Sequence, residues 1–186
     1  KKLVVSITTN GTRFTPEALD FLAEHRIGVS VSIDGPPDLH DANRPYVGTH
    51  GRGSYADVVD GVARLRERTG RPPAARVTLN PDQWARIPEV FEHVLGLGFL
   101  EVGIAPTSPV SAKLLPTPEQ DEALLAGFSR LAERFAAEAE RGRVLPFSNL
   151  LDLLAKLHLG QVKAVPCGAG LGYVAMDAEG AFFLCH

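Results

Sequence analysis

The residues best suited to chemistry are two cysteines near the end of the chain, Cys167 and Cys185. They are the only cysteines in 186 residues, and their spacing is C-x12-G-x4-C, with Gly180 as the glycine. Thiolates ligate iron–sulfur clusters and zinc, so the pair could supply half of a metal site. Two buried thiols or one disulfide are the other interpretations of a lone cysteine pair.

A β-hairpin between the cysteines would bring them together. Two short apolar runs, 173–176 and 181–184, flank the sequence Asp-Ala-Glu-Gly at 177–180, which is typical of a hairpin with a glycine-closed loop. Glycine adopts positive φ without a Cβ clash, so Gly180 allows a tight turn. The pattern predicts that the cysteines become near neighbours.

Composition limits the class of protein. The chain is 45% hydrophobic with a net charge of −3, and neither sign forms a long run. One substantial core is expected, and nucleic acid is not expected as a partner. No apolar run approaches the roughly twenty residues of a membrane span, and the start does not resemble a signal peptide. Two cysteines without signs of secretion favour the cytoplasm. Both ends are abrupt, so we expect a fragment of a longer protein.

Upstream of the cysteines, the sequence predicts four successive β-then-α units. Strands are expected at 3–7, 29–33, 76–79 and 99–104. Helices are expected after the cap Thr15, after Ser54 as the cap of a second helix, and at 88–97, and a loop is expected over 38–53. Such units build a parallel sheet, either a partial (β/α) barrel or an open doubly wound sheet. In both folds, the loops after the strands carry the chemistry.

Two further helices are expected before the hairpin. Thr117-Pro118 and Gln120 form a capping-box pattern that opens the longest helix, to about residue 141. Its predicted inner stripe consists of Leu124, Leu125, Phe128, Leu131 and Phe135. A short helix at 149–159 then leads to the cysteine hairpin.

Four short motifs resemble, in this order, the middle strands of the radical S-adenosylmethionine (SAM) maturases of peptides and proteins. They are ITTNGT at 7–12, VSIDGP at 31–36, HDANR at 40–44 and GRGSY at 51–55. The cysteine spacing is similar to the start of the SPASM domain, the iron–sulfur extension of these enzymes. Thioether-forming maturases and the quinohemoprotein amine dehydrogenase maturation protein are the nearer relatives in this resemblance, and anaerobic sulfatase maturases are more distant.

The resemblance implies an α/β fold with three parts. These are a partial (β/α) TIM-like barrel of the radical SAM type at 1–106, a helical connector at 107–165 and the β-hairpin start of a SPASM domain at 166–186.

The resemblance also implies a cofactor site at the strand tips. The position of Ser32 commonly contacts the methionine moiety of SAM in this family, and a hydroxyl suits an ammonium and a carboxylate because it donates and accepts. Asn10 is expected to face the same cavity, and Arg44 is a cation for a carboxylate. Each residue also has a purely structural alternative. Ser32 could be a hydroxyl at a strand end, Asn10 a turn residue, and Arg44 a member of a surface ion pair.

Two [4Fe–4S] clusters follow from the resemblance. Cys167 and Cys185 would ligate an auxiliary cluster, and His186 would act as a base beside it or tune it by a hydrogen bond. The C-x3-C-x2-C loop that holds the SAM-cleaving cluster is absent, so that cluster would be bound outside this chain, and the chain alone should be inactive.

The expected reaction is modification of a peptide side chain. Sulfatase maturases carry an aspartate after the second hairpin cysteine, where this chain has His186, so a crosslink such as a thioether is favoured over formylglycine. The expected partners are a ribosomally made peptide or protein substrate and an external electron donor. The alternatives are a non-catalytic relative that binds a peptide or protein, an α/β enzyme with Cys167 as nucleophile, and a zinc site at the two cysteines.

Overall fold

The computed structural model describes residues 4–48, 51–107, 115–162, 169 and 174–184. The chain falls into two compact units, Lys1–Leu150 and Leu151–His186. The first unit contains the strands and helices of the predicted barrel together with the long helix that the sequence assigns to a connector.

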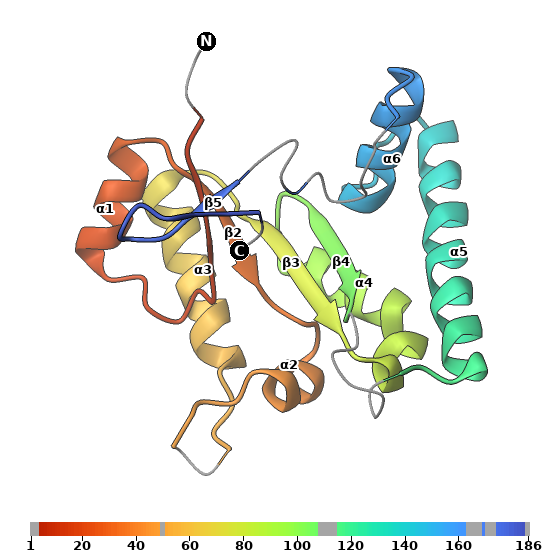
Figure 1. Cartoon of the computed structure of the whole chain (residues 1–186), viewed down its shortest axis with the longest axis horizontal. Helices are drawn as coiled ribbons and strands as arrows, with labels where there is room; N and C mark the ends of the chain where they lie inside the picture. Colours follow the sequence, from red (N-terminus) through yellow and green to blue (C-terminus); the bar gives the residue numbers. More distant parts are fainter. Residues whose placement is uncertain (1–3, 49–50, 108–114, 163–168, 170–173, 185–186) are drawn as a thin grey trace. The chain divides into compact units, whose positions relative to one another are not determined.

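The described part of the first unit is built on a parallel four-stranded sheet. Its strands are β1 (Ser6–Thr9), β2 (Gly28–Ser32), β3 (Ala74–Leu79) and β4 (Val102–Pro106). They lie side by side in chain order, as Figure 1 shows. A doubly wound sheet reverses its strand order at a switch point, whereas a barrel adds each strand to the same edge. The observed order therefore fits the predicted partial barrel.

The main helices begin where local sequence signals predict. Thr15 caps α1 (Pro16–Glu24) by accepting a hydrogen bond from Ala18 N–H, and a Thr117–Gln120 capping box opens α5 (Pro118–Glu140). This unit also contains α3 (Tyr55–Thr69), the 3₁₀ helix η1 (Pro81–Arg86) and α4 (Ile87–Gly96).

The helices pack on one face of the sheet. On that face the side chains at the centre of the sheet are fully buried or nearly so: Val31, Ala75, Val77, Leu79, Val102, Ile104 and Ile33, which directly follows β2. From α5, Leu131 is buried in the same core, whereas Leu125 is 70% exposed. The prediction that Leu125 belongs to the inner stripe is therefore wrong, because the stripe follows its partly buried neighbours Leu124 and Phe128.

Two predictions around residues 38–54 are also wrong. The expected loop contains a short helix, α2 (Pro37–Asn43). Ser54 precedes α3 but does not cap it with its side chain. Asp41 takes that role, since its Oδ1 accepts from Tyr55 N–H at 2.8 Å. The cap comes from a residue fourteen positions away, which no local pattern indicates.

A further segment extends the sheet beside β4. Val102 N–H donates to Pro146 O at 2.9 Å, and Val102 forms a parallel bridge with Phe147. The side-chain amide of Asn149 then bonds both backbone groups of Ile104, accepting from its N–H at 2.9 Å and donating to its carbonyl at 2.8 Å. The chain thus returns through α5 to the next position in the barrel order.

The second unit contains the predicted hairpin. It follows α6 (Ser148–His158), which begins at the end of the first unit. β5 (Ala175–Met176) pairs antiparallel with β6 (Phe182–Phe183), and Gly180 has a φ of +88° in the loop between them. The hairpin prediction is confirmed over the described residues 174–184.

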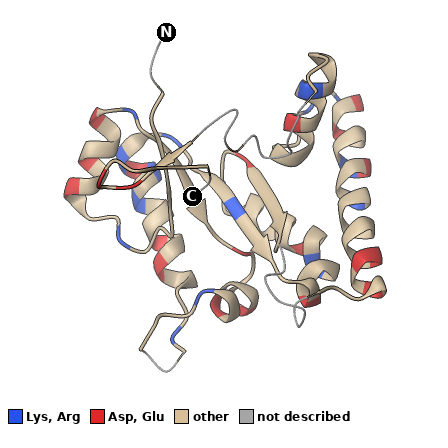
Figure 2. Ribbon diagram, in the orientation of Figure 1, with Lys and Arg blue, Asp and Glu red and all other residues tan. Residues whose placement is uncertain are grey.

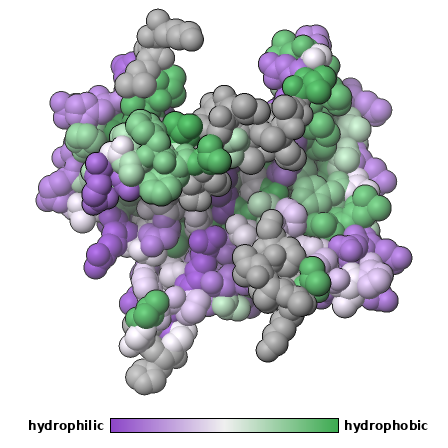
Figure 3. Space-filling view, viewed as in Figure 1, coloured by the Kyte–Doolittle hydropathy of each residue, from purple (hydrophilic) through white to green (hydrophobic). Residues whose placement is uncertain are grey.

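Charged residues lie mainly on the helices and loops (Figure 2). On the face in Figure 3, hydrophilic and hydrophobic residues are interspersed. Among the helices of the described residues, none combines the length and the apolar character that crossing a membrane requires.

Candidate functional site

The face of the sheet opposite the helices is polar and less buried. Ser30 and Ser32 of β2 are half-buried on it, while Arg76 and Thr78 of β3 are exposed. In the strand register, Ser32 is paired with Arg76, which is paired in turn with Gly103. Because the barrel side of a parallel sheet binds ligands at the carboxyl ends of its strands, this face and edge form the candidate site.

Ser32 and Asn10 lie next to each other at this edge. β1 pairs with β2 up to Thr9 and Val31, so Asn10 follows β1 at the level of Ser32. Asn10 Oδ1 accepts from both the N–H and the hydroxyl of Thr12, at 3.2 and 3.0 Å. Asn10 therefore closes the turn after β1 and is also part of the site.

Asn10 and Arg44 line one cavity of about 170 Å3, together with His40, Tyr46 and Ser54. The structure therefore brings together two of the three residues that the sequence assigns to cofactor binding. Ser32 lies at the same edge but is not part of the lining of this cavity.

Arg44 has a carboxylate partner within the chain. Its Nε–H and Nη2–H donate to Asp34 at 2.7 and 3.1 Å, and the side chain of Asp34 is only 2% exposed. Asp34 Oδ1 also accepts from Thr78 N–H at 2.9 Å, just beyond the last backbone bond between β2 and β3. Asp34 thus ties the tip of β2 to β3 and to Arg44, which sequence reasoning missed.

His40 completes a closed ring of hydrogen bonds that also includes Asp34, Arg44 and Ser54. Its Nδ1 accepts from Asp34 N–H at 3.2 Å, and its Nε2 lies 3.0 Å from Ser54 Oγ. The Ser54 hydroxyl donates to the Arg44 carbonyl at 2.7 Å. Since a hydroxyl has one hydrogen, His40 Nε2 must donate to Ser54. Because Nδ1 is an acceptor and carries no proton, this arrangement corresponds to a neutral imidazole.

The environment of His40 agrees with a neutral ring. Burial lowers the pKa of His40, and the Arg44 charge lowers it further, whereas Asp34 and Asp41 act in the opposite direction. Every buried side-chain nitrogen and oxygen among the described residues has a hydrogen-bond partner. This edge of the sheet is therefore a rigid, fully bonded support for the cavity.

A network of side-chain amides supports the neighbouring strand tips. Asn43 and Gln83 bond to each other in both directions, at 3.0 and 2.9 Å. Asn80, directly after β3, donates to Asn43 and accepts from the Thr107 hydroxyl, which follows β4. The network thus joins the tips of two strands to α2 and η1. The spacing of Asn80 and Gln83, a capping-box pattern at η1, was the signal that could have indicated it.

The three remaining candidate residues, Cys167, Cys185 and His186, lie outside the described residues. Within the residues that the structure describes, no group of three or more His, Cys, Asp or Glu side chains is arranged to hold a metal.

The chain was compared with protein-family models, with curated proteins and with solved structures. No protein-family model matches the chain. The serine-type anaerobic sulfatase-maturating enzyme of Bacteroides thetaiotaomicron is 39% identical over 61 residues, which are 33% of this chain and 14% of that protein.

Solved structures match nearly the whole chain. Native anSMEcpe with bound AdoMet and Kp18Cys peptide superimposes with a TM-score of 0.72 and 17% identity, over 94% of this chain and 47% of that one. SuiB of Streptococcus suis gives a TM-score of 0.61 and 16% identity, over 97% of this chain and 43% of SuiB. The chain therefore spans less than half the length of the solved structures it matches.

The fold and site define an α/β half-barrel whose carboxyl edge carries polar side chains. More specifically, the chain has the fold of the radical SAM peptide and sulfatase maturases, which confirms the resemblance and the fold class predicted from the sequence.

Proposed function

We propose that this chain is part of a radical SAM enzyme that modifies a peptide or protein side chain. The observation that supports this most is the polar carboxyl edge around Ser32, Asn10 and Arg44, on a fold shared with a structure that contains AdoMet and a peptide. When bound, SAM and its [4Fe–4S] cluster supply a 5′-deoxyadenosyl radical that abstracts hydrogen from a substrate.

Of the described residues, Ser32 suits the amino-acid end of SAM best. Ser32 offers a hydroxyl on the open face, which can bond an ammonium or a carboxylate. Arg44 keeps 30% of its side chain exposed at the cavity, although Asp34 already balances its charge. We therefore assign Arg44 mainly to holding the β2 tip and Asn10 to shaping the turn beside Ser32.

We further propose that Cys167 and Cys185 ligate an auxiliary [4Fe–4S] cluster and that His186 acts as a base beside it. The β5–β6 hairpin and the positive φ of Gly180 support this assignment, because they fold back the segment between the cysteines. Zinc is the alternative metal, since two ligands from elsewhere would complete a tetrahedral site. Iron and sulfide analysis of the purified protein distinguishes the two.

For the reaction, we propose a crosslink such as a thioether, made in the cytoplasm with an external electron donor. His186 supports this choice, because it stands where the sulfatase maturases carry an aspartate. Formylglycine formation is the second candidate, favoured by the 39% identity to a sulfatase-maturating enzyme over 61 residues.

Mass spectrometry of a treated peptide separates these candidates. The full-length protein is incubated anaerobically with SAM, dithionite and a peptide that contains cysteine and serine. A thioether and a serine-derived formylglycine both remove two hydrogens from the peptide, but only formylglycine carries an aldehyde that reacts with hydrazine. Loss of two hydrogens without hydrazine reactivity supports the crosslink. A hydrazine-reactive product supports formylglycine instead, and an unmodified peptide favours a non-catalytic, peptide-binding relative.

A further inference from the structure

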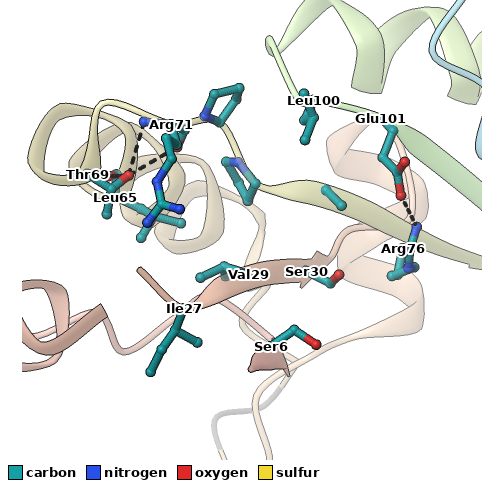
Figure 4. Close-up of a pocket in the computed structure, with 14 residues that line it drawn as sticks. Ser6, Ile27, Val29, Ser30, Leu65, Thr69, Arg71, Arg76, Leu100 and Glu101 are labelled. Carbon is teal, nitrogen blue, oxygen red and sulfur yellow. Dashed lines mark hydrogen bonds and ion pairs between the residues drawn. The ribbon is translucent and has the colours of Figure 1, made fainter. Parts of the chain in front are cut away.

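A large hollow in the described first unit lies at the amino edge of the sheet, and its lining does not include Ser32, Asn10 or Arg44. It has a volume of about 550 Å3 and is bordered by the first residues of three strands, Ser6, Gly28 and Ala74. Figure 4 shows side chains from these strands and from the loops before β3 and β4 around it. We call this hollow the amino-edge pocket.

Most of the pocket wall is apolar. Ile27, Pro72, Pro73 and Leu100 come from the loops that precede the strands, and Leu65 comes from α3. Leu100 is 61% exposed, so the wall offers apolar surface that a ligand could cover. A pocket of this size accommodates one or two large side chains.

The charged side chains of the pocket carry a net positive charge. Arg76 donates to Glu101 Oε1 at 3.1 Å, and both side chains are partly exposed, at 45% and 32%. Arg71 is exposed and makes no ion pair among the described residues. Two guanidinium groups thus face one carboxylate, although the chain as a whole has a net charge of −3. In Figure 4 the two arginines stand at opposite sides of the pocket.

The backbone leaves room for this arrangement. A Cβ added at Gly103, which is paired with Arg76 across the sheet, would lie 3.0 Å from Arg76 Nη1 and 2.7 Å from Ser148 Oγ. The absence of a side chain at Gly103 therefore lets the guanidinium lie across β4 and reach Glu101. The positive group is thus held at the sheet by its surroundings and does not extend freely into solvent.

We propose that the amino-edge pocket binds an acidic segment of the peptide substrate that also carries large apolar side chains. The choice of a peptide rests on the proposed function, whereas the acidic and apolar character rests on the pocket itself. Carboxylates of the segment would bond Arg71 and Arg76, and its apolar side chains would cover Leu100 and the two prolines. Binding at the amino edge would leave the carboxyl edge free for the residue to be modified.

The test is a binding assay that needs neither SAM nor reductant. Fluorescence anisotropy of the full-length protein is measured with a labelled, end-blocked peptide in which two glutamates flank a leucine–phenylalanine pair. Two control peptides replace the glutamates by glutamine or the apolar pair by serine. Both controls are expected to bind more weakly. Added salt should weaken binding of the two peptides that contain glutamate and leave binding of the glutamine peptide unchanged.

Amino-acid substitutions test whether the peptide binds in the amino-edge pocket. Arg71→Glu and Arg76→Gln should each raise the Kd roughly fivefold, the size expected for a partly exposed charge contact. Arg130→Glu, on the exposed side of α5, makes the same charge change as Arg71→Glu and should leave the Kd unchanged. Arg71→Glu breaks no ion pair of the described residues, so it remains informative if Arg76→Gln does not fold.

The proposal is overturned if the glutamine peptide binds as tightly as the acidic one, or if Arg130→Glu weakens binding as much as Arg71→Glu. Absence of 5′-deoxyadenosine formation would contradict the proposed radical function but would not change this binding result, so the two failures can be told apart.

Discussion

Asp34 accepts two hydrogen bonds from Arg44, from Nε–H at 2.7 Å and from Nη2–H at 3.1 Å, at the tip of β2. Its carboxylate is almost fully buried and also bonds Thr78 N–H. Where the backbone hydrogen bonds between β2 and β3 end, the Asp34 carboxylate therefore serves as the acceptor for Thr78 N–H in place of a backbone carbonyl. Asp34 thus holds the tip of β2 next to Ser32, the residue that we propose contacts SAM.

Asp34→Ala should lower the free energy of unfolding by about 3 kcal/mol, because it leaves Arg44 without its partner and Thr78 N–H without its acceptor. Asp60→Ala is the matched control, since Asp60 forms an exposed ion pair with Arg64 within α3. That change should cost less than about 0.5 kcal/mol. Urea unfolding measures the free energy of unfolding of both variants. An equal loss in the two variants would contradict a central role for Asp34.

His40 should make stability depend on pH near neutrality. Burial lowers its pKa in the folded state below the unfolded value of about 6.5, so the unfolded chain binds more protons there. Its contribution is fully present above pH 6.5 and declines as the pH falls below that value. Unfolding between pH 7.5 and roughly 5 should show this decline. His40→Gln should make the profile flatter, and an unchanged slope would show that His40 is not responsible.

Gly61 should not tolerate a side chain, because α3 packs closely against the turn after β1. A Cβ at Gly61 would lie 2.2 Å from Gly11 O. Gly61→Ala should therefore destabilise the fold by about 2 kcal/mol through overpacking. Gly96→Ala, at the end of α4, meets nothing within 4 Å and should be neutral or stabilising by up to about 1 kcal/mol. The same loss of stability at both sites would rule out the close approach as the cause.

Ser32→Ala should weaken SAM binding roughly five- to tenfold, the loss expected for a hydrogen bond to a charged group. Ser30→Ala removes a hydroxyl from the same strand and face, one pleat nearer the amino edge, and should leave SAM affinity unchanged. Isothermal titration with the full-length protein gives both values. If Ser30→Ala has the larger effect, the cofactor site does not lie at the carboxyl edge.

Much of the fold could be predicted because its signals are local. Thr15, Thr117 and Gln120 cap their helices through residues three positions away, and the β-α-β pattern follows from short apolar runs. The supports of the site could not be predicted in this way. Asp41 caps a helix fourteen residues away, and Asp34 meets Thr78 across forty-four residues. These residues become partners because the sheet and its helices pack together, and the hydrophobic periodicity of the sequence contains no information about such distant contacts.

The most direct test of the central proposal is the formation of 5′-deoxyadenosine. The full-length protein is purified anaerobically, its clusters are reconstituted with iron and sulfide, and it is incubated with SAM and dithionite. Chromatography with mass detection should find 5′-deoxyadenosine, at a lower rate in Ser32→Ala than in Ser30→Ala. A protein with intact clusters that consumes no SAM would contradict the radical SAM assignment.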